Sequence, residues 1–192
     1  MYELGEKATN AFENSRKRIA DFIGASKNSI VFTKSATESI NLVAESWGYD
    51  NLNSGDVILL TDMEHHSNII PWQIICKKTG AKIKYIRSTE NGTINLEDLK
   101  KSLDSNVKIV SITHASNVFG TINPVKEITS IVKKNGSKIM IDGCQSIPHM
   151  KVNVKDLDCD FYAFSGHKMF GPTGVGVLSV SYTHLTLPTS SW

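Results

Sequence analysis

Residues 161–178 read FYAFSGHKMFGPTGVGVL, and this stretch decides how the sequence is interpreted. It begins with an apolar run typical of a buried strand, continues with His167 and Lys168, and ends in a glycine-rich turn and a second apolar run. Lysine side chains mostly lie in solvent. A lysine between a buried strand and a tight turn therefore indicates either a chemical role or an ordinary surface loop.

Outward from this stretch, short apolar runs alternate with segments of helical spacing. Strands are predicted at 29–33, 56–61, 82–86, 107–113, 138–142, 160–164 and 174–178. Helices are predicted at 12–23, 35–48, 68–80, 96–103 and 124–136, and none is expected between 143 and 159. This alternation predicts an α/β fold with three αβα layers, in which a mostly parallel sheet has helices on both faces.

Polar residues follow five of the predicted strands. They occupy residues 33–37, 64–66, 113–117, 142–145 and 165–168. Ligands of open α/β sheets bind outside the carboxyl ends of the strands. The sequence therefore predicts one binding site along that edge of the sheet.

The composition is that of an ordinary globular domain. The 192 residues are 40% hydrophobic and 21% charged, with a net charge of +2 from scattered lysines and arginines, so no nucleic acid is expected as a partner. No apolar run approaches the roughly 18 residues that would span a membrane. The three cysteines lack CxxC spacing, which predicts reduced thiols in a cytoplasmic protein; they are Cys76, Cys144 and Cys159.

The last residues differ from the rest of the chain. Residues 179–192 read SVSYTHLTLPTSSW, without a charged side chain and with Ser or Thr at half of the positions. We expect residues 1–178 to form a cofactor-binding large domain that is incomplete at its N-terminus, and residues 179–192 to be foreign to the fold.

Lys168 and Asp142 together indicate a pyridoxal phosphate (PLP) site. An unprotonated lysine amine forms a Schiff base with an aldehyde. Asp142 ends a buried strand, where a carboxylate needs a cationic partner such as the pyridinium nitrogen of PLP. Each residue alone has a simpler interpretation: Lys168 as a surface lysine, and Asp142 as the cap of the next turn.

A phosphate group has a predicted site at a strand-to-helix junction. Ser35, Ala36 and Thr37 lie where backbone N–H groups and the helix dipole favour an anion. The hydroxyls of Thr37 and Ser165 and the imidazole of His167 add donors. Plain N-capping of the helix is the alternative.

The double histidine after Glu64 does not predict a metal site. His65 and His66 are adjacent and no further ligand spacing follows, so no metal is expected. A histidine stacked on a flat cofactor ring fits better, and two structural histidines in a turn are the alternative. His114 and His149 are interpreted as structural.

Several motifs resemble the class V aminotransferase superfamily, and within it the SufS-type cysteine desulfurases, also described as selenocysteine lyases. The resemblance covers residues 5–178. Its motifs are ATESINLVAESWG, MEHHSNIIPWQ, ITHASNVFGTINP, DGCQSIPHMKVNVKDLDCDFYAFSGHK and SGHKMFGPTGVG. It implies the large domain of PLP-dependent transferase fold type I.

The resemblance also implies a role for matching residues around the cofactor ring. Lys168 matches the lysine that binds PLP covalently and later moves the Cα proton. His65 matches the histidine that stacks on the pyridine ring. Asp142 matches the partner of the pyridinium nitrogen, and Gln145 matches the donor to the phenolic oxygen.

Matching residues around the phosphate and the substrate are implied in the same way. Thr37, Ser165 and His167 match phosphate ligands, and the backbone at Ala36 assists them. Asn117 matches the asparagine near the cofactor and the substrate carboxylate.

The activity implied by the resemblance is conversion of L-cysteine to L-alanine, with the sulfur transferred as an enzyme persulfide for iron–sulfur cluster assembly. L-Cysteine or L-selenocysteine is the implied substrate, and a homodimer and a sulfur-acceptor protein are the implied partners. Another class V enzyme (an aminotransferase, kynureninase or epimerase) is one alternative. A non-catalytic fragment without independent function is another.

Two features of the resembling family have no match here. Its nucleophilic cysteine and its substrate-carboxylate arginine lie beyond the point where this sequence ends, and none of the three cysteines lies in the catalytic motif. Cys144 is expected near the cofactor as a packing residue. We therefore expect this chain by itself to make no alanine from cysteine.

Overall fold

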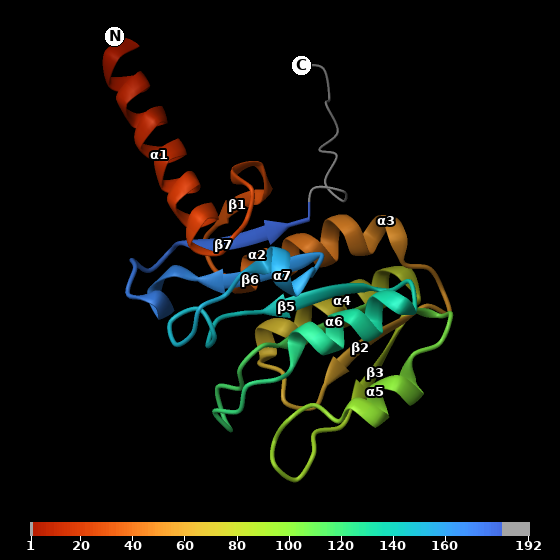
Figure 1. The fold of residues 1–192 in the computed structure, drawn as a ribbon. Helices are drawn as coiled ribbons and strands as arrows, with labels where there is room; N and C mark the ends of the chain where they lie inside the picture. The colour runs from red at the N-terminus through yellow and green to blue at the C-terminus, as the bar shows by residue number, and fades with distance from the viewer. Residues whose placement is uncertain (1, 182–192) are drawn as a thin grey trace.

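The fold is centred on one seven-stranded sheet, and the computed structural model describes residues 2–181 (Figure 1). The strands lie in the order β1-β7-β6-β5-β4-β2-β3. Their bounds are β1 (Ile30–Thr33), β2 (Val57–Thr61), β3 (Lys82–Ile86), β4 (Val107–Thr113), β5 (Lys138–Asp142), β6 (Phe161–Ser165) and β7 (Gly176–Val180).

Six of the seven strands point in the same direction. The pairs β2–β3, β2–β4, β4–β5 and β5–β6 are parallel. Strand β7 is antiparallel to both of its neighbours, β1 and β6, so these two strands run the same way. The mostly parallel sheet is thus confirmed, and the ends of β1, β2, β4, β5 and β6 meet at one edge.

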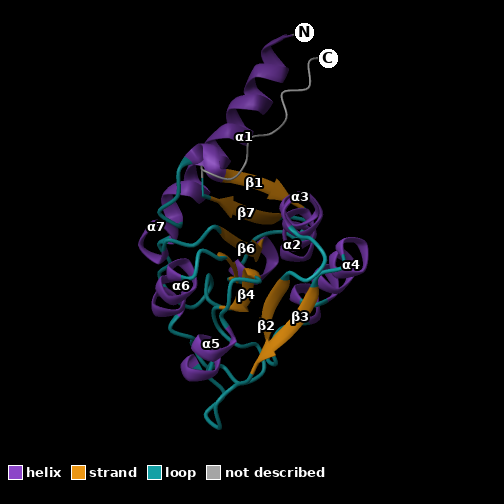
Figure 2. Cartoon of the chain, turned by 90° about the vertical axis from the view of Figure 1, so that its right-hand side faces the viewer, coloured by secondary structure: helices purple, strands orange, loops and turns teal. Residues whose placement is uncertain are grey.

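Helices cover both faces of the sheet, which confirms the three-layer αβα architecture (Figure 2). The face with α2 and α4 also holds α3, and the other holds α5, α6 and α7. The bounds of these helices are α2 (Ala36–Val43), α3 (Tyr49–Asn51), α4 (Ile70–Thr79), α5 (Leu96–Ser102), α6 (Val125–Lys134) and α7 (Val154–Leu157). A π-helical turn, Ala44–Gly48, joins α2 to α3.

Strand β2 shows how the sequence specifies this layering. All five of its residues are buried. Leu59 packs into the hydrophobic cluster on the face of α5 and α6, whereas Leu60 packs into the cluster that contains Trp72 of α4. Successive side chains of a strand point to opposite faces, so a strand buried on both faces must be apolar throughout.

Helix α4 begins and ends where its sequence predicts. Pro71 lies in the first turn, where a missing backbone N–H has no intrahelical partner to lose. Gly80 follows the last turn in the left-handed conformation, with φ 81°, and its N–H donates to the Cys76 carbonyl at 2.9 Å. This end is a common helix stop because glycine has no Cβ to clash there.

Helix α1 (Tyr2–Phe22) begins ten residues before the predicted helix and projects from the sheet (Figure 1). Ala20 is its one buried residue. It contacts the sheet through Ala20, which packs into the core, and through Phe12, whose ring centroid lies 4.9 Å from that of Phe32. The Arg16 guanidinium lies over both rings and donates to the Ile30 carbonyl.

Two details differ from the predictions. Helix α7 lies in the segment expected to be helix-free, and Asn153 caps it by accepting from the N–H groups of Lys155 and Asp156. The expected boundary after Leu178 falls inside β7, because Ser179 and Val180 pair with β6. Residues 182–192 of the expected tail lie outside the described residues. Within residues 2–181, no helix is long and apolar enough to cross a membrane.

Candidate functional site

A cavity of about 270 Å³ lies at the edge of the sheet where the parallel strands end. This volume is near the lower limit of roughly 300–1,000 Å³ for small-molecule sites. The cavity brings together the ten residues that the sequence placed at the cofactor site: Ser35, Ala36, Thr37, His65, Asn117, Asp142, Gln145, Ser165, His167 and Lys168.

Asp142 forms a buried acidic wall of the cavity at the end of β5. It is 5% exposed, and its Oδ1 accepts from the Cys144 backbone N–H at 2.9 Å. The turn after it depends on Gly143, since a Cβ there would lie 2.1 Å from the Tyr162 ring. Gly143 therefore lets Tyr162 pack directly beneath Asp142 and Cys144.

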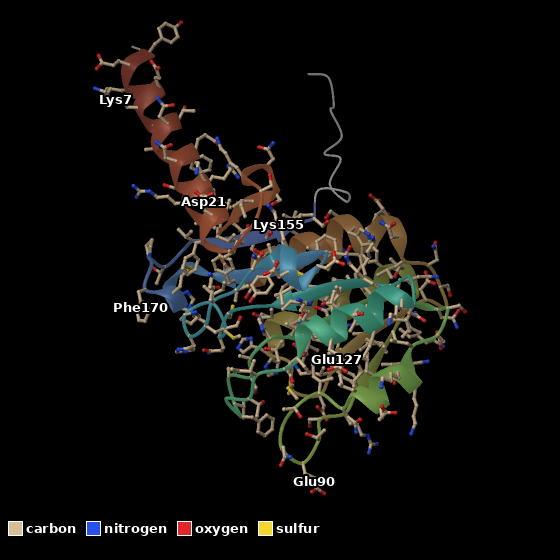
Figure 3. All side chains as sticks on the ribbon, in the orientation of Figure 1. Lys7, Asp21, Glu90, Glu127, Lys155 and Phe170 are labelled. Atoms are coloured by element: carbon tan, nitrogen blue, oxygen red, sulfur yellow. The ribbon has the colours of Figure 1, made fainter. Side chains whose placement is uncertain are left out.

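Lys168 enters the cavity from the turn that follows β6. It belongs to the short 3-10 helix Gly166–Met169 and is partly buried. The Gly171 N–H donates to the Gly166 carbonyl at 2.9 Å, and a Cβ at Gly171 would meet that oxygen at 2.9 Å. Phe170 projects outward from the same turn (Figure 3). Among the described residues, no ion pair joins Lys168 to Asp142, so both remain available to a ligand.

The third wall is the N-terminus of α2. The Ser35 hydroxyl accepts from the Glu38 N–H at 3.2 Å and caps the helix. The Ala36 N–H donates to the Ser165 hydroxyl at 2.9 Å, which joins this terminus to the end of β6. A Cβ at Gly176 would lie 2.4 Å from the Ser35 backbone, so this close approach requires glycine in β7. The positive end of the helix dipole thus faces the cavity beside two hydroxyls and His167.

His65 lines the cavity from the turn after β2. Its Nδ1 accepts from the Ser67 N–H at 3.1 Å and lies 2.8 Å from the Ser67 hydroxyl. A ring nitrogen that accepts from a backbone N–H is unprotonated, so in the neutral ring the proton is on Nε2. His66 contacts His65 edge-on, with ring centroids 6.3 Å apart, and does not line the cavity.

Asn117 reaches the cavity from an exposed turn. The turn is closed by a hydrogen bond of 2.9 Å from the Ser116 N–H to the Thr121 carbonyl, and Ala115 pairs with Ile122. It follows β4 and lines the cavity.

Four further residues line the cavity without having been assigned a binding role: Ser67, Thr113, Ala115 and Cys144. Three of them lie in segments that the sequence placed at strand ends, and Ser67 follows His65 by two positions. Cys144 was expected to pack near the site; it is 8% exposed, and burial raises the pKa of its thiol to about 12. Such a thiol is protonated at neutral pH and therefore a poor nucleophile.

Three hydrogen-bonded side chains are buried beneath Asp142. The Tyr162 hydroxyl is 2.9 Å from His114 Nδ1 and 2.6 Å from the Ser146 hydroxyl. Burial lowers the pKa of His114 to about 4, so this imidazole is neutral at neutral pH. His114 does not line the cavity. Within residues 2–181, no three His, Cys, Asp or Glu side chains come together as metal ligands.

The donor set fits PLP. The cofactor has an aldehyde for an amine, a pyridine nitrogen for a carboxylate and a phosphate for a helix N-terminus. The cavity provides one of each, in Lys168, Asp142 and α2, around a volume that no side chain fills.

Comparisons with known proteins agree with this geometry. The sequence model of the family described as aminotransferase class-V matches residues 1–188, and the chain belongs to this family. A "Probable cysteine desulfurase" of Halalkalibacterium halodurans is 53% identical over 186 residues, which are 96% of this chain and 46% of that protein.

Solved structures of cysteine desulfurases share the fold. The enzyme CsdA of Escherichia coli (S-sulfonic acid form) has a TM-score of 0.90 at 34% identity, over 94% of this chain and 45% of its own. The apo enzyme of Thermococcus onnurineus NA1 has a TM-score of 0.89 at 44% identity, over the same shares. The α/β sheet thus matches PLP-dependent fold type I structures, and the chain spans about half the length of the curated relatives it matches.

Proposed function

We propose that this chain is the PLP-binding large domain of a cysteine desulfurase. The whole enzyme converts L-cysteine to L-alanine and holds the sulfur as a persulfide for iron–sulfur cluster assembly. The observation that supports this most is the single cavity shared by Lys168, Asp142 and the α2 terminus. The names of the relatives support cysteine as the substrate.

The proposal assigns each wall of the cavity to one part of PLP. Asp142 would hold the pyridine nitrogen and Lys168 would bind the aldehyde carbon. Gln145 would donate to the phenolic oxygen, and the His65 ring would contact the pyridine ring. The phosphate would be held at the α2 terminus by Ala36, Thr37, Ser165 and His167. When bound, PLP is an electron sink for negative charge at the substrate Cα.

The protein side chains orient the substrate and move its proton. Once the substrate amine has replaced it at the aldehyde carbon, the freed Lys168 Nζ would accept the proton from the substrate Cα, and among the described residues Lys168 is the one lysine that lines the cavity. Asn117 orients the substrate carboxylate from the exposed side of the cavity. L-Cysteine or L-selenocysteine is the substrate, and a homodimer with a sulfur-acceptor protein is the assembly we propose.

A PLP titration followed by visible absorbance tests this function. Wild type is expected to develop the absorbance of covalently bound PLP, and Lys168→Ala is expected to lose it. Lys155→Ala is the matched control, because Lys155 is an exposed lysine outside the cavity (Figure 3). Equal absorbance in all three chains would contradict the proposal.

Substrate titrations of the loaded chain then separate the alternatives within the family. L-Cysteine is expected to change the absorbance at lower concentration than L-alanine or L-kynurenine. A preference for L-kynurenine, or an equal response to all three, would contradict a desulfurase.

A further inference from the structure

Glu64 is a buried carboxylate directly before His65. It is 7% exposed and accepts three hydrogen bonds. Its Oε1 accepts from the Thr61 hydroxyl at 2.5 Å and from the Thr113 backbone N–H at 2.9 Å. Its Oε2 accepts from Asn68 Nδ2 at 2.7 Å. The carboxylate therefore joins the ends of β2 and β4 to the turn that contains His65.

Asn68 extends this network from the other end of the turn. It is fully buried, and its Oδ1 accepts from Trp72 Nε1 at 3.0 Å and from the Ser111 hydroxyl at 2.6 Å. The turn is thus fixed to β4 at two places, Ser111 and Thr113, and to α4 at Trp72. His65 is the exposed, cavity-lining residue between these fixed points.

The network requires a carboxylate because every partner of Glu64 is a donor. Burying a charge is costly unless hydrogen bonds or an opposite charge compensate for it. Among the described residues Glu64 forms no ion pair, and burial together with the nearby Asp142 charge raises its pKa to about 7. A buried acid held by neutral donors alone indicates a specific role for this position.

We propose that Glu64 is a positioning residue that holds His65 against the cofactor cavity. The carboxylate acts through the turn and does not itself line the cavity. This inference rests on the proposed function, since the effect on the cofactor passes through the His65 ring.

Glu64→Gln breaks the network with a side chain of nearly the same shape as glutamate. An amide has one accepting oxygen and one donating NH₂, so its NH₂ must face either the Thr113 N–H or the Asn68 amide. A flip of the Asn68 amide would direct its own NH₂ at the Trp72 N–H. In each arrangement a buried donor loses its acceptor, and the turn shifts.

The first test measures PLP affinity and the NMR resonances of the His65 ring. Glu64→Gln is expected to weaken PLP binding about tenfold, which is about 1.4 kcal/mol and within the range for leaving one buried donor without its acceptor. In the cofactor-free chain, its His65 ring resonances are expected to move in an NMR spectrum. Asp62→Asn is the matched control: this carboxylate lies in the same turn, but it is exposed and accepts from Ser88. It is expected to leave both readouts unchanged.

A double-mutant cycle separates positioning from general stability. In a His65→Ala background, Glu64→Gln is expected to have no further effect on PLP affinity, since the ring through which it acts is gone. An additive tenfold loss there would overturn the proposal, as would unchanged His65 resonances in the cofactor-free single variant.

PLP binding by the wild-type chain and the NMR comparison separate failure of the proposed function from failure of the proposal for Glu64. Failure of the wild-type chain to bind PLP would refute the proposed function, while the NMR comparison still tests Glu64. If Glu64→Gln does not fold, Ser111→Ala replaces it, because this change removes one donor to Asn68. Ser111→Ala is expected to weaken PLP binding about twofold. Unchanged affinity and unchanged His65 resonances in Ser111→Ala would overturn the proposal.

Discussion

The cavity edge of the sheet and helix α1 use their residues in opposite ways. At the cavity edge, polar groups such as Asp142 and Ser165 are buried and hydrogen-bonded on elements of the sheet. Along α1, apolar side chains such as Tyr2 and Leu4 are 93% and 79% exposed, and Ala20 is the one buried residue. Polar burial is costly and apolar exposure is unfavourable, so each region departs from the usual distribution.

This contrast shows where the fold places its chemistry. The cavity is lined by residues between Ser35 and Lys168 that lie mostly at strand ends, whereas α1 packs against the rest of the chain through Phe12, Arg16 and Ala20. We therefore expect substitutions at the cavity edge to have large effects on binding or stability, and substitutions in the N-terminal half of α1 to have small ones.

Among substitutions in the two regions, Asp142→Asn at the cavity edge is expected to have the largest effect. The amide is neutral and cannot stabilise a pyridinium charge, so PLP affinity should fall about 100-fold, which is about 2.7 kcal/mol. A fluorescence titration with PLP measures it. Asp156→Asn, at an exposed acid of α7, is the control and should bind as wild type does. Equal affinity in both variants would remove Asp142 from the site.

The second-largest effect is expected on the free energy of unfolding, from a substitution of Tyr162 beneath Asp142. Tyr162→Phe deletes the hydroxyl that is bonded to His114 and Ser146. A buried ring nitrogen then loses its partner, and the free energy of unfolding should fall by about 2 kcal/mol. Urea unfolding followed by circular dichroism measures this change. A loss below about 0.5 kcal/mol would show that the buried group contributes little.

A smaller effect appears in the pH dependence. The pKa of His114 is about 4 in the folded chain against 6.5 when exposed, so the unfolded chain binds more protons between these values. Its contribution to stability is therefore lost as the pH falls, by about 1.5 kcal/mol from pH 6.5 to pH 5. Glu64, with a raised pKa, has the opposite trend, so the contribution must be isolated by comparison.

The comparison uses His114→Gln, which does not titrate. The difference in unfolding free energy between wild type and this variant should shrink as the pH falls. A difference that is constant from pH 6.5 to pH 5 would contradict a buried neutral His114.

The smallest effect is expected in α1. Leu4→Ala removes an exposed side chain from a helix surface, and the free energy of unfolding should change by less than about 0.5 kcal/mol. Thermal unfolding measures it, beside Leu60→Ala of β2 as a buried counterpart, for which about 3 kcal/mol is expected. A large loss for Leu4→Ala would show that the N-terminal turns of α1 also pack against the rest of the chain.

Most of the fold could be predicted because the strands are short, mostly apolar and bounded by turns. The edge of the sheet was predictable for the same reason, since the polar residues follow directly after apolar runs. Helix α7 was not predicted, because four residues capped by Asn153 have too little periodicity to show. The extent of α1 was also missed, as it lacks a continuous apolar stripe.

The sequence could predict which residues form the site, but not the contacts between them. Lys168 and Asp142 stand out as unusual residues next to buried strands. Ser67 and Thr113 do not, since hydroxyl residues are common in turns and their place in the cavity depends on the pairing of distant strands. Glu64 was noticed beside two histidines, but its burial and its bond to Thr113 arise from tertiary structure.

The central claim is that Lys168 reacts with a cofactor held at the cavity edge. Borohydride reduction of the chain with PLP, followed by peptide mass spectrometry, tests it most directly, because reduction fixes the cofactor to the amine that holds it. We predict one labelled peptide, containing Lys168, and no label in Lys168→Ala. Label spread over exposed lysines such as Lys155, or no label in wild type, would contradict the account.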